Sequence, residues 1–301
     1  MRLGLTGATG FVGSEVHRQA LRRGWEIVAL TRSDSHPESV GSTPTTLVRG
    51  DLTDPDGCRG VFRDVDAILH CANAIQGEPD HLAAVNITGT QTVIGEFEGS
   101  SRVRSLGVIS TAAVYDDRSH RQMREVDGIE APSSTRSHTR LVADRMIRAA
   151  GGFALRPHFV VGPGDTHVLP TAAALARHLA PGAVHSFIDV RDLAEFVVQM
   201  TARRVGSGRA FHVSGPNPAG WDAVLGAIGV AGPSIRCDDS HVGEPTARQL
   251  SLLNVEHTYD DSSARSLTGF VPSRDPSSPD AAYLRWYRST LPRSVTPTSG
   301  S

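Results

Sequence analysis

The stretch Thr6-Gly-Ala-Thr-Gly-Phe-Val-Gly13 carries three glycines at intervals of three residues, between an apolar run and an amphipathic one. Glycine lets the backbone approach a pyrophosphate closely, and the N-terminus of a following helix offers it free N–H groups and a partial positive charge. The stretch therefore predicts the phosphate-binding turn of a dinucleotide-binding domain. The residues that we expect to contact the dinucleotide there are Gly7, Thr9, Gly10, Phe11, Val12 and Gly13.

Strands and helices alternate on both sides of this turn. Val12, Val16 and Ala20 recur every fourth residue, as one face of a helix requires. We also expect a helix N-cap at Asp54-Pro55 and one long helix over residues 80–98. Short buried strands are expected at residues 2–6, 26–30, 46–49, 66–71, 105–110 and 153–156. This order predicts an α/β fold, a Rossmann-type doubly wound parallel sheet.

The end of the second strand bears on the choice between NAD and NADP. A site that prefers NAD normally offers an acidic residue to the ribose 2′-hydroxyl about 20 residues after the glycines. Arg32 occupies that neighbourhood, and a guanidinium suits a 2′-phosphate. We therefore favour NADP. Asp34 lies close by in the sequence and could reverse the preference, so NAD stays open.

The strand and helix pattern becomes irregular after residue 162. A strand at 185–188 and a helix with an apolar face over 193–200 still follow. We expect an NAD(P)-binding Rossmann domain over residues 1–162 and a smaller C-terminal substrate-binding lobe over 163–290, interleaved with the main sheet. The last segment, residues 291–301, is expected to be a disordered tail.

The composition is that of an ordinary globular protein, with 39% hydrophobic and 21% charged residues in a chain of 301. A net charge of -2 and scattered arginines argue against a nucleic-acid partner, and no apolar run reaches the roughly 18 to 20 residues that span a bilayer. Three widely spaced cysteines, Cys58, Cys71 and Cys237, fit neither a disulfide framework nor a metal site. We expect a cytoplasmic protein with a small-molecule substrate, no bound metal and no membrane partner.

Further short motifs follow the glycine turn along the chain, and together they are more specific than any one alone. They are Gly50-Asp-Leu-Thr-Asp54, His70-Cys-Ala-Asn73, Val85-Asn-Ile-Thr-Gly-Thr90, Ser110-Thr-Ala-Ala-Val-Tyr115, Leu155-Arg-Pro157 with Gly162-Pro-Gly-Asp165, and Phe187-Ile-Asp-Val-Arg-Asp192. In this order, over residues 1 to about 215, the chain resembles the extended short-chain dehydrogenase/reductase family, also called the NAD-dependent epimerase/dehydratase family. The resemblance implies that Asp51 and Leu52 lie along the adenine and Ala72 and Asn73 along the cofactor. It is also compatible with a homodimer.

The catalytic motif of that family is altered in this chain. The family uses a Ser or Thr on the fifth strand, a proton-transferring Tyr, and a Lys four residues later that holds the nicotinamide ribose and lowers the pKa of the Tyr. Thr111 matches the first position, but Arg136 stands in place of Tyr and Arg140 in place of Lys. The chain contains no Lys at all, so no shift of alignment restores the motif.

The altered residues allow several roles. Arg140 can still hold ribose hydroxyls, whereas Arg136, with a pKa above about 12, is a poor acid or base. Arg136 can instead bind an oxyanion, a carboxylate or a phosphate, or it is a solvated helix residue. Tyr115 is a candidate proton donor or a packing residue, and His138 is a weaker candidate because it points away from Arg136 on the same helix.

The substrate end also departs from the family members that act on nucleotide sugars. Phe159 and Val161 stand where those often carry Asn and Tyr, and His185 stands where they often carry an arginine. An apolar lining favours a smaller, less charged metabolite, for example one of secondary metabolism.

We predict an NADP-dependent oxidoreductase acting on a ketone or alcohol. The alternatives are a diverged enzyme that epimerises, eliminates or cyclises with bound cofactor, and a non-catalytic NADP-binding sensor or regulator.

Overall fold

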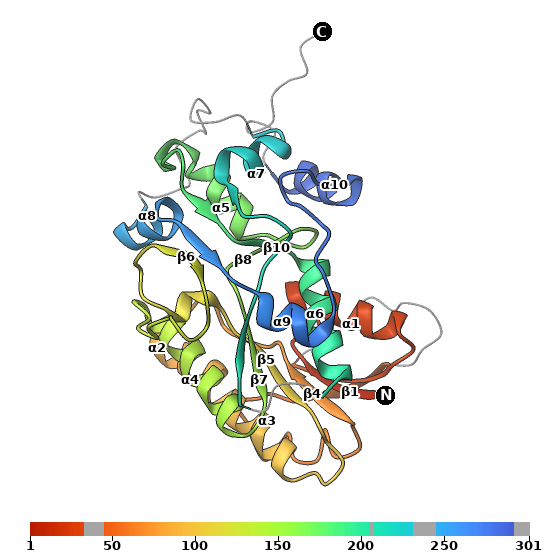
Figure 1. The fold of residues 1–301 in the computed structure, drawn as a ribbon. Helices are drawn as coiled ribbons and strands as arrows, with labels where there is room; N and C mark the ends of the chain where they lie inside the picture. The colour runs from red at the N-terminus through yellow and green to blue at the C-terminus, as the bar shows by residue number, and fades with distance from the viewer. Residues whose placement is uncertain (33–44, 205–207, 231–244, 292–301) are drawn as a thin grey trace.

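The computed structural model describes residues 1–32, 45–204, 208–230 and 245–291. A seven-stranded sheet, parallel throughout, forms the larger part of the fold (Figure 1). Its strand order is β11 (Ala210–Val213), β7 (Phe153–Pro157), β5 (Leu106–Ile109), β4 (Ala67–His70), β1 (Arg2–Thr6), β2 (Glu26–Thr31) and β3 (Thr45–Arg49). The chain order reverses direction at β1, so the carboxyl ends of β1 and β4 flank the switch point where doubly wound sheets bind ligands.

Helices cover both faces of this sheet (Figure 1). One face carries α1 (Phe11–Arg22), α6 (Val190–Ala202) and α9 (Ser262–Thr268), and the other carries α2 (Pro79–Ala83), η1 (Ala84–Thr88), α3 (Gly89–Glu98) and α4 (Thr135–Ala149). Each face has its own apolar core, centred on Leu5 and Phe196 on one side and on Ile68 and Ile147 on the other. The predicted Rossmann-type doubly wound parallel sheet is confirmed.

Two of the expected helices differ from the prediction. No helix forms after Asp54-Pro55, where residues 55–64 make a run of turns, with Gly57 and Gly60 inside it. Gly60 has a φ of +79°, which a helix does not accommodate. The long helix expected over 80–98 is continuous, but its middle, η1, is a π-helical turn.

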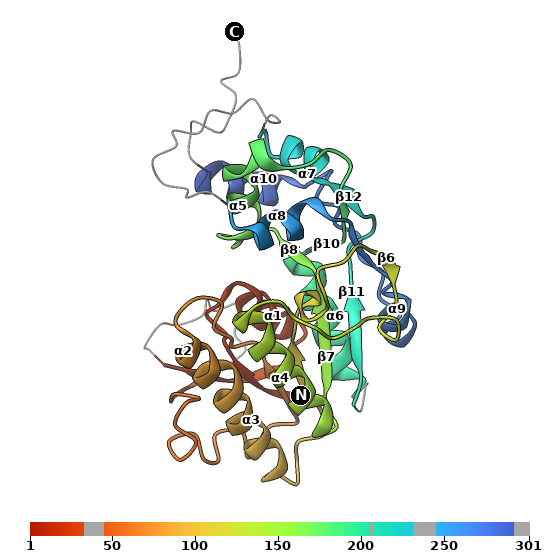
Figure 2. The ribbon, with the colours of Figure 1, turned by 90° about the vertical axis from the view of Figure 1, so that its left-hand side faces the viewer.

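The smaller part of the fold stands beyond the carboxyl edge of the main sheet (Figure 2). It contains two small sheets, one of β8 (Phe159–Val161) and β10 (Phe187–Asp189), the other in the order β12 (Ala219–Gly220), β9 (Val184–His185), β13 (His257–Tyr259), β6 (His120–Met123). Its helices are α5 (Val168–Ala174), η3 (Ala176–His178), α7 (Trp221–Ala227), α8 (Ala247–Asn254) and α10 (Ala281–Thr290). A short 3-10 helix, η2 (Ala112–Val114), follows β5.

The two parts are interleaved along the chain. After building β8, β9 and β10, the chain returns to the main sheet with α6, which packs on α1, and with β11, which pairs with β7. The division at residues 162 and 290 stays a prediction, and residues 292–301 of the expected tail lie outside the described residues. In the described residues no helix is long and apolar enough to cross a membrane, and Cys58 and Cys71 are buried free thiols.

Candidate functional site

The glycine turn joins β1 to α1 and needs glycine for steric reasons. Gly7 has a φ of +71°, and a Cβ there would lie 2.6 Å from the backbone nitrogen of Ala72. A Cβ at Gly13 would overlap the carbonyl oxygen of Gly7. The turn is therefore a bare backbone cradle, the shape that close approach of a pyrophosphate requires.

The N-terminus of α1 faces this cradle without an anionic partner in the described structure. Gly10 is its N-cap, no described side chain caps it, and its first turn contains no acidic residue. Thr9 and Gly10 are exposed, while Phe11 and Val12 are half-buried. The N–H groups and partial positive charge of this helix end are thus available to a phosphate, so the residues present fit a dinucleotide.

Arg32 and Asp51 lie beyond the carboxyl ends of two neighbouring strands, β2 and β3. Arg32 is exposed and directly follows β2. The carboxylate of Asp51 accepts hydrogen bonds from the Thr53 N–H and hydroxyl, both at 2.9 Å, and Leu52 beside it is buried. The Thr53 N–H, with a smaller contribution from the charge of Arg32, lowers the pKa of Asp51. Asp34, the rival for the 2′ position, lies outside the described residues.

The loop after β4 is fixed by Asn86, which lies in the π-helical turn η1. The Ala74 N–H donates to Asn86 Oδ1 at 2.7 Å, and Asn86 Nδ2 donates to the carbonyl of Ala74 at 3.0 Å and to Thr139 Oγ1 of α4 at 2.9 Å. Single π-helical turns are frequent at functional sites because they re-aim a side chain. Here Asn86 ties Ala74, which directly follows Ala72 and Asn73, to α4.

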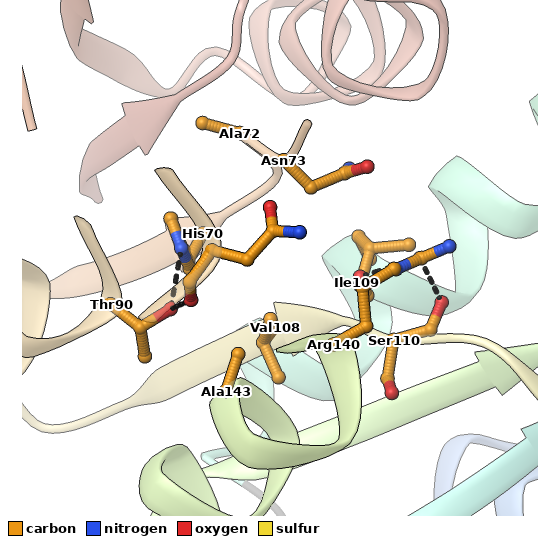
Figure 3. Close-up of a pocket in the computed structure, with 10 residues that line it drawn as sticks. His70, Ala72, Asn73, Thr90, Val108, Ile109, Ser110, Arg140 and Ala143 are labelled. Atoms are coloured by element: carbon orange, nitrogen blue, oxygen red, sulfur yellow. Dashed lines mark hydrogen bonds between the residues drawn. The ribbon is translucent and has the colours of Figure 1, made fainter. Parts of the chain in front are cut away.

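A small pocket lies between this loop, β5 and α4 (Figure 3). Arg140 reaches into it from α4, and its Nη2 donates to the carbonyl oxygens of Ser110 at 2.7 Å and Ile109 at 3.3 Å. Burial first, and then the charge of Arg136, lower the pKa of Arg140 to about 10, so it stays a cation at neutral pH. Asn73 and Asn86 also line the pocket.

A series of buried hydrogen bonds through His70 lies beside the pocket. His70 Nδ1 lies 2.7 Å from Thr6 Oγ1, and His70 Nε2 lies 3.1 Å from Thr90 Oγ1. Burial lowers the pKa of His70 to about 4, which keeps the ring neutral. Thr6 in turn accepts the Ala72 N–H at 3.2 Å. These hydrogen bonds therefore connect the glycine turn to the loop that follows β4.

Thr111 lies at the carboxyl end of β5, next to the carbonyl that holds Arg140. It is the N-cap of η2, and its Oγ1 accepts the Ala113 N–H at 3.2 Å. That bond uses a lone pair of the hydroxyl and leaves its proton to donate. Thr111 and Arg140 therefore lie at the same edge of the sheet.

Arg136 lies one turn before Arg140 on α4 and is half-buried. Its Nη1 donates to the carbonyl of Ile75 at 3.3 Å. Burial, and then the charge of Arg248 from α8, lower the pKa of Arg136. His138, on the same helix, is exposed. Arg136 thus lies on α4 near Arg140, at the carboxyl edge of the sheet. Nothing in the geometry supports a catalytic role for His138.

Tyr115 lies elsewhere than the proton-donor hypothesis requires. It is 1% exposed, and its hydroxyl lies 2.8 Å from His212 Nε2 and accepts a hydrogen bond from Arg156 Nη1 at 2.9 Å. Arg156 is itself held by Asp144. Burial raises the pKa of the Tyr115 phenol further. Of the two roles considered for Tyr115, this buried network favours packing over proton donation.

The three residues expected at the substrate end are packed in the interior of the smaller part. Phe159 is 7% exposed, and Val161 and His185 are fully buried. His185 Nε2 donates to the carbonyl of Leu253 at 3.0 Å, and burial lowers the pKa of His185 to about 4. Phe159 and Val161 belong to the apolar core of the smaller part.

Two residues at the candidate site, Asn86 and Arg248, were not predicted from the sequence. Asn86 lies inside the motif Val85-Asn-Ile-Thr-Gly-Thr90, where periodicity predicted an ordinary helix. Its hydrogen bonds to the loop after β4 could therefore not be predicted. Arg248 lies 112 residues after Arg136 in the sequence and had no motif around it. Only the tertiary contact between α8 and α4 reveals it.

Comparisons with known proteins agree with this geometry. The model of the NAD dependent epimerase/dehydratase family matches residues 4–214. A 2-alkyl-3-oxoalkanoate reductase of Stenotrophomonas maltophilia is 27% identical over 243 residues, 72% of this chain and 72% of that protein. A dTDP-4-dehydro-6-deoxy-D-allose reductase of a Streptomyces species is 29% identical over 298 residues, 85% of this chain and 90% of that protein.

A solved structure shares the fold. The Bordetella bronchiseptica enzyme WbmH, crystallised in complex with NAD+, superposes with a TM-score of 0.72 at 21% identity, covering 95% of this chain and 98% of that one. At this identity the likeness concerns the fold alone.

Proposed function

Because the chain belongs to the NAD-dependent epimerase/dehydratase family, we propose that it is an NADP-dependent reductase of a ketone, or dehydrogenase of the corresponding alcohol, acting on a small metabolite. The observation that carries this proposal is the joint placement of two features. A glycine cradle lies at the carboxyl end of β1, and a cation, Arg140, is held against the carboxyl end of β5.

Different residues along the carboxyl edge of the sheet contact different parts of the cofactor. The glycine turn and the N-terminus of α1 receive the pyrophosphate, and Asp51 and Leu52 lie along the adenine. Arg32 pairs with a 2′-phosphate through charge-assisted hydrogen bonds, which is our reason for choosing NADP. Ala72 and Asn73 line the middle of the path, and Arg140 offers its remaining N–H donors to the nicotinamide ribose.

Reduction needs a hydride and a proton, and the bound nicotinamide supplies the hydride. Thr111 donates its hydroxyl proton in a hydrogen bond to the carbonyl oxygen of the substrate, which orients the carbonyl and stabilises the charge that develops on it. A water molecule in exchange with bulk solvent relays the proton to the resulting alkoxide, because Arg136 stands where the family carries its proton-donating Tyr and the Tyr115 hydroxyl is buried. Two relatives named as reductases support carbonyl reduction over the other reactions of the family.

A second function is favoured by one specific observation, the replacement of the Tyr-Lys pair by Arg136 and Arg140. Without a phenol at that position, a non-catalytic protein that binds NADP and reports redox state is the main rival. An enzyme that epimerises, eliminates or cyclises with retained cofactor is the third candidate. In both of these cases the cofactor site is kept while net hydride transfer is lost.

Turnover measurements separate these functions. We expect loss of NADPH absorbance with a panel of small ketones, and a kcat about 10- to 100-fold lower for Thr111→Ala at unchanged NADPH affinity. Thr290→Ala, on α10, serves as the matched control and keeps the wild-type rate. Wild-type rates in Thr111→Ala would refute the assigned role. NADPH binding without hydride transfer to any ketone would favour the rival functions.

A further inference from the structure

Three arginines gather where the smaller part of the fold meets α4. Arg136 and Arg140 lie on adjoining turns of that helix. Arg248 of α8 reaches across to them, with its Nε donating to Ser133 Oγ at 2.6 Å and its Nη2 to Ser137 Oγ at 3.1 Å. Ser137 is the neighbour of Arg136 in the sequence, so Arg248 is anchored beside it.

In the described part of the chain, none of these three cations has a carboxylate partner. Arg136 donates to a backbone carbonyl, Arg140 to two backbone carbonyls, and Arg248 to two hydroxyls. The acid of α4 closest along the chain to Arg140, Asp144, is already held by Arg156 and Arg148. Within the described residues, the hydrogen-bond partners of this arginine cluster are therefore neutral oxygens.

Other arginines that are buried or half-buried show that this arrangement is unusual for the protein. Arg156 is paired with Asp144 and Glu130, Arg148 with the same two acids, and Arg191 with Asp189 and Asp280. Burying a cation without an anionic partner costs free energy, because the cation loses its hydration. Placing several cations side by side adds electrostatic repulsion. Burial and a neighbouring arginine lower the pKa values of both Arg136 and Arg140, and the charge of Asp144 offsets only part of this effect at Arg140. An anion bound here would offset both costs.

The cluster also lies where a substrate would meet the cofactor. Arg140 lines the pocket at the carboxyl end of β5, next to Thr111, and Arg136 is one turn farther toward the N-terminus of α4. Arg248 approaches from the smaller part. Guanidinium groups are planar, and two of them can grip an oxyanion through paired hydrogen bonds.

We propose that Arg136 and Arg248 together bind an oxyanionic group of the substrate, a carboxylate or a phosphate, and so select an anionic carbonyl compound. This inference rests on the proposed reductase function. It replaces the less charged metabolite expected from the apolar residues Phe159 and Val161, which the structure places in a packed interior. Arg136 thus binds charge at the position where the family carries its proton donor.

Calorimetric titration of the NADPH-saturated protein tests the binding of the anion itself. The probes are hexanoate, its uncharged analogue hexanamide, and inorganic phosphate. Wild-type protein should bind hexanoate or phosphate and not hexanamide, and the preferred anion identifies the group. Arg248→Gln and Arg136→Gln should each weaken that binding about 10- to 100-fold. Arg285→Gln, which removes an equal charge from an exposed position of α10, should leave it unchanged.

No binding of either anion would overturn the inference, and so would hexanamide binding as tightly as the preferred anion. So would anion affinity that survives both substitutions in variants whose circular dichroism matches the wild type. The same titrations without NADPH, together with a direct NADPH titration, show separately whether cofactor binding fails. In that case the reductase proposal falls, while anion binding by the arginine cluster is still decided by the cofactor-free titration with hexanoate, compared between the wild type and Arg248→Gln.

Discussion

Gly13 is the residue at which the glycine turn is least tolerant of a side chain. Gly13→Ala would place a methyl group against the carbonyl of Gly7 and displace the cradle. We expect a loss of about 1–3 kcal/mol in the free energy of unfolding and loss of detectable NADPH binding. Denaturant unfolding and cofactor titration measure the two effects.

Gly95→Ala provides the contrasting change. No described atom lies within 4 Å of a Cβ at Gly95 in α3, so Ala should stabilise the helix by about 0.5–1 kcal/mol and leave cofactor binding intact. If Gly13→Ala behaved like Gly95→Ala, the steric account of the turn would be wrong.

Tyr115 tests the distinction between a catalytic and a packing role. Tyr115→Phe leaves Arg156 Nη1 and His212 Nε2 without their hydroxyl partner in the interior. The expected result is a loss of about 1–3 kcal/mol in the free energy of unfolding with kcat within twofold of wild type. Stability and turnover are measured on one preparation. A large fall in kcat without loss of stability would restore Tyr115 as the proton donor.

At the scale of elements, the π-helical turn η1 positions the loop after β4 through one side chain. Asn86→Ala removes three hydrogen bonds that tie Ala74 and Thr139 to this turn. The loop should loosen, and the Kd for NADPH should rise about tenfold, the equivalent of roughly 1.4 kcal/mol. Asn217→Ala, at an exposed position, is the control. An unchanged Kd in Asn86→Ala would show that the clamp does not shape the cofactor path.

The elements also show which parts of the secondary structure can be predicted from sequence patterns. Buried apolar runs and the glycine turn were sufficient to predict six of the seven strands of the main sheet, because parallel strands are buried on both faces. The edge strand β11 was not predicted. The cap signal at Asp54-Pro55 failed, since Gly57 and Gly60 favour turns over a helix in the same segment. The π-helical turn could not be predicted, because its extra residue depends on the contact of Asn86 with α4.

For the molecule as a whole, buried histidines couple stability to pH. Burial lowers the pKa values of His185 and His257 to about 4 and of His212 to about 3, and it lowers that of His158 well below its ordinary value. In the unfolded chain these rings titrate near 6.5. Below pH 6.5 these histidines are protonated in the unfolded state but stay neutral in the native state. The free energy of unfolding therefore falls as the pH drops from about 6.5 toward 4.

The pH dependence is measured by urea unfolding at pH 7.5 and pH 5.5. Each histidine contributes a slope of up to about 1.4 kcal/mol per pH unit, so the protein should be several kcal/mol less stable at the lower pH. His257→Gln should reduce the difference. Equal stability at the two pH values would contradict neutral burial of the histidines.

Also at the scale of the whole molecule, the fold was predictable from the sequence, whereas the substrate site was predictable only in part. The positions of Arg136 and Arg140 follow from local spacing on one helix. The buried surroundings of Tyr115 and the approach of Arg248 depend on chain segments that lie about 40 to 140 residues away, whose packing no local pattern encodes. The apolar residues Phe159 and Val161 suggested a lining, but they serve the core of the smaller part.

The most direct test of the account is a fluorescence titration of wild-type protein and Arg32→Ala with NADPH and NADH. We predict that the wild type binds NADPH more tightly than NADH, and that Arg32→Ala weakens NADPH binding about 10- to 100-fold with little change for NADH. Binding of neither cofactor by the wild type would contradict the central claim that the glycine turn holds a dinucleotide.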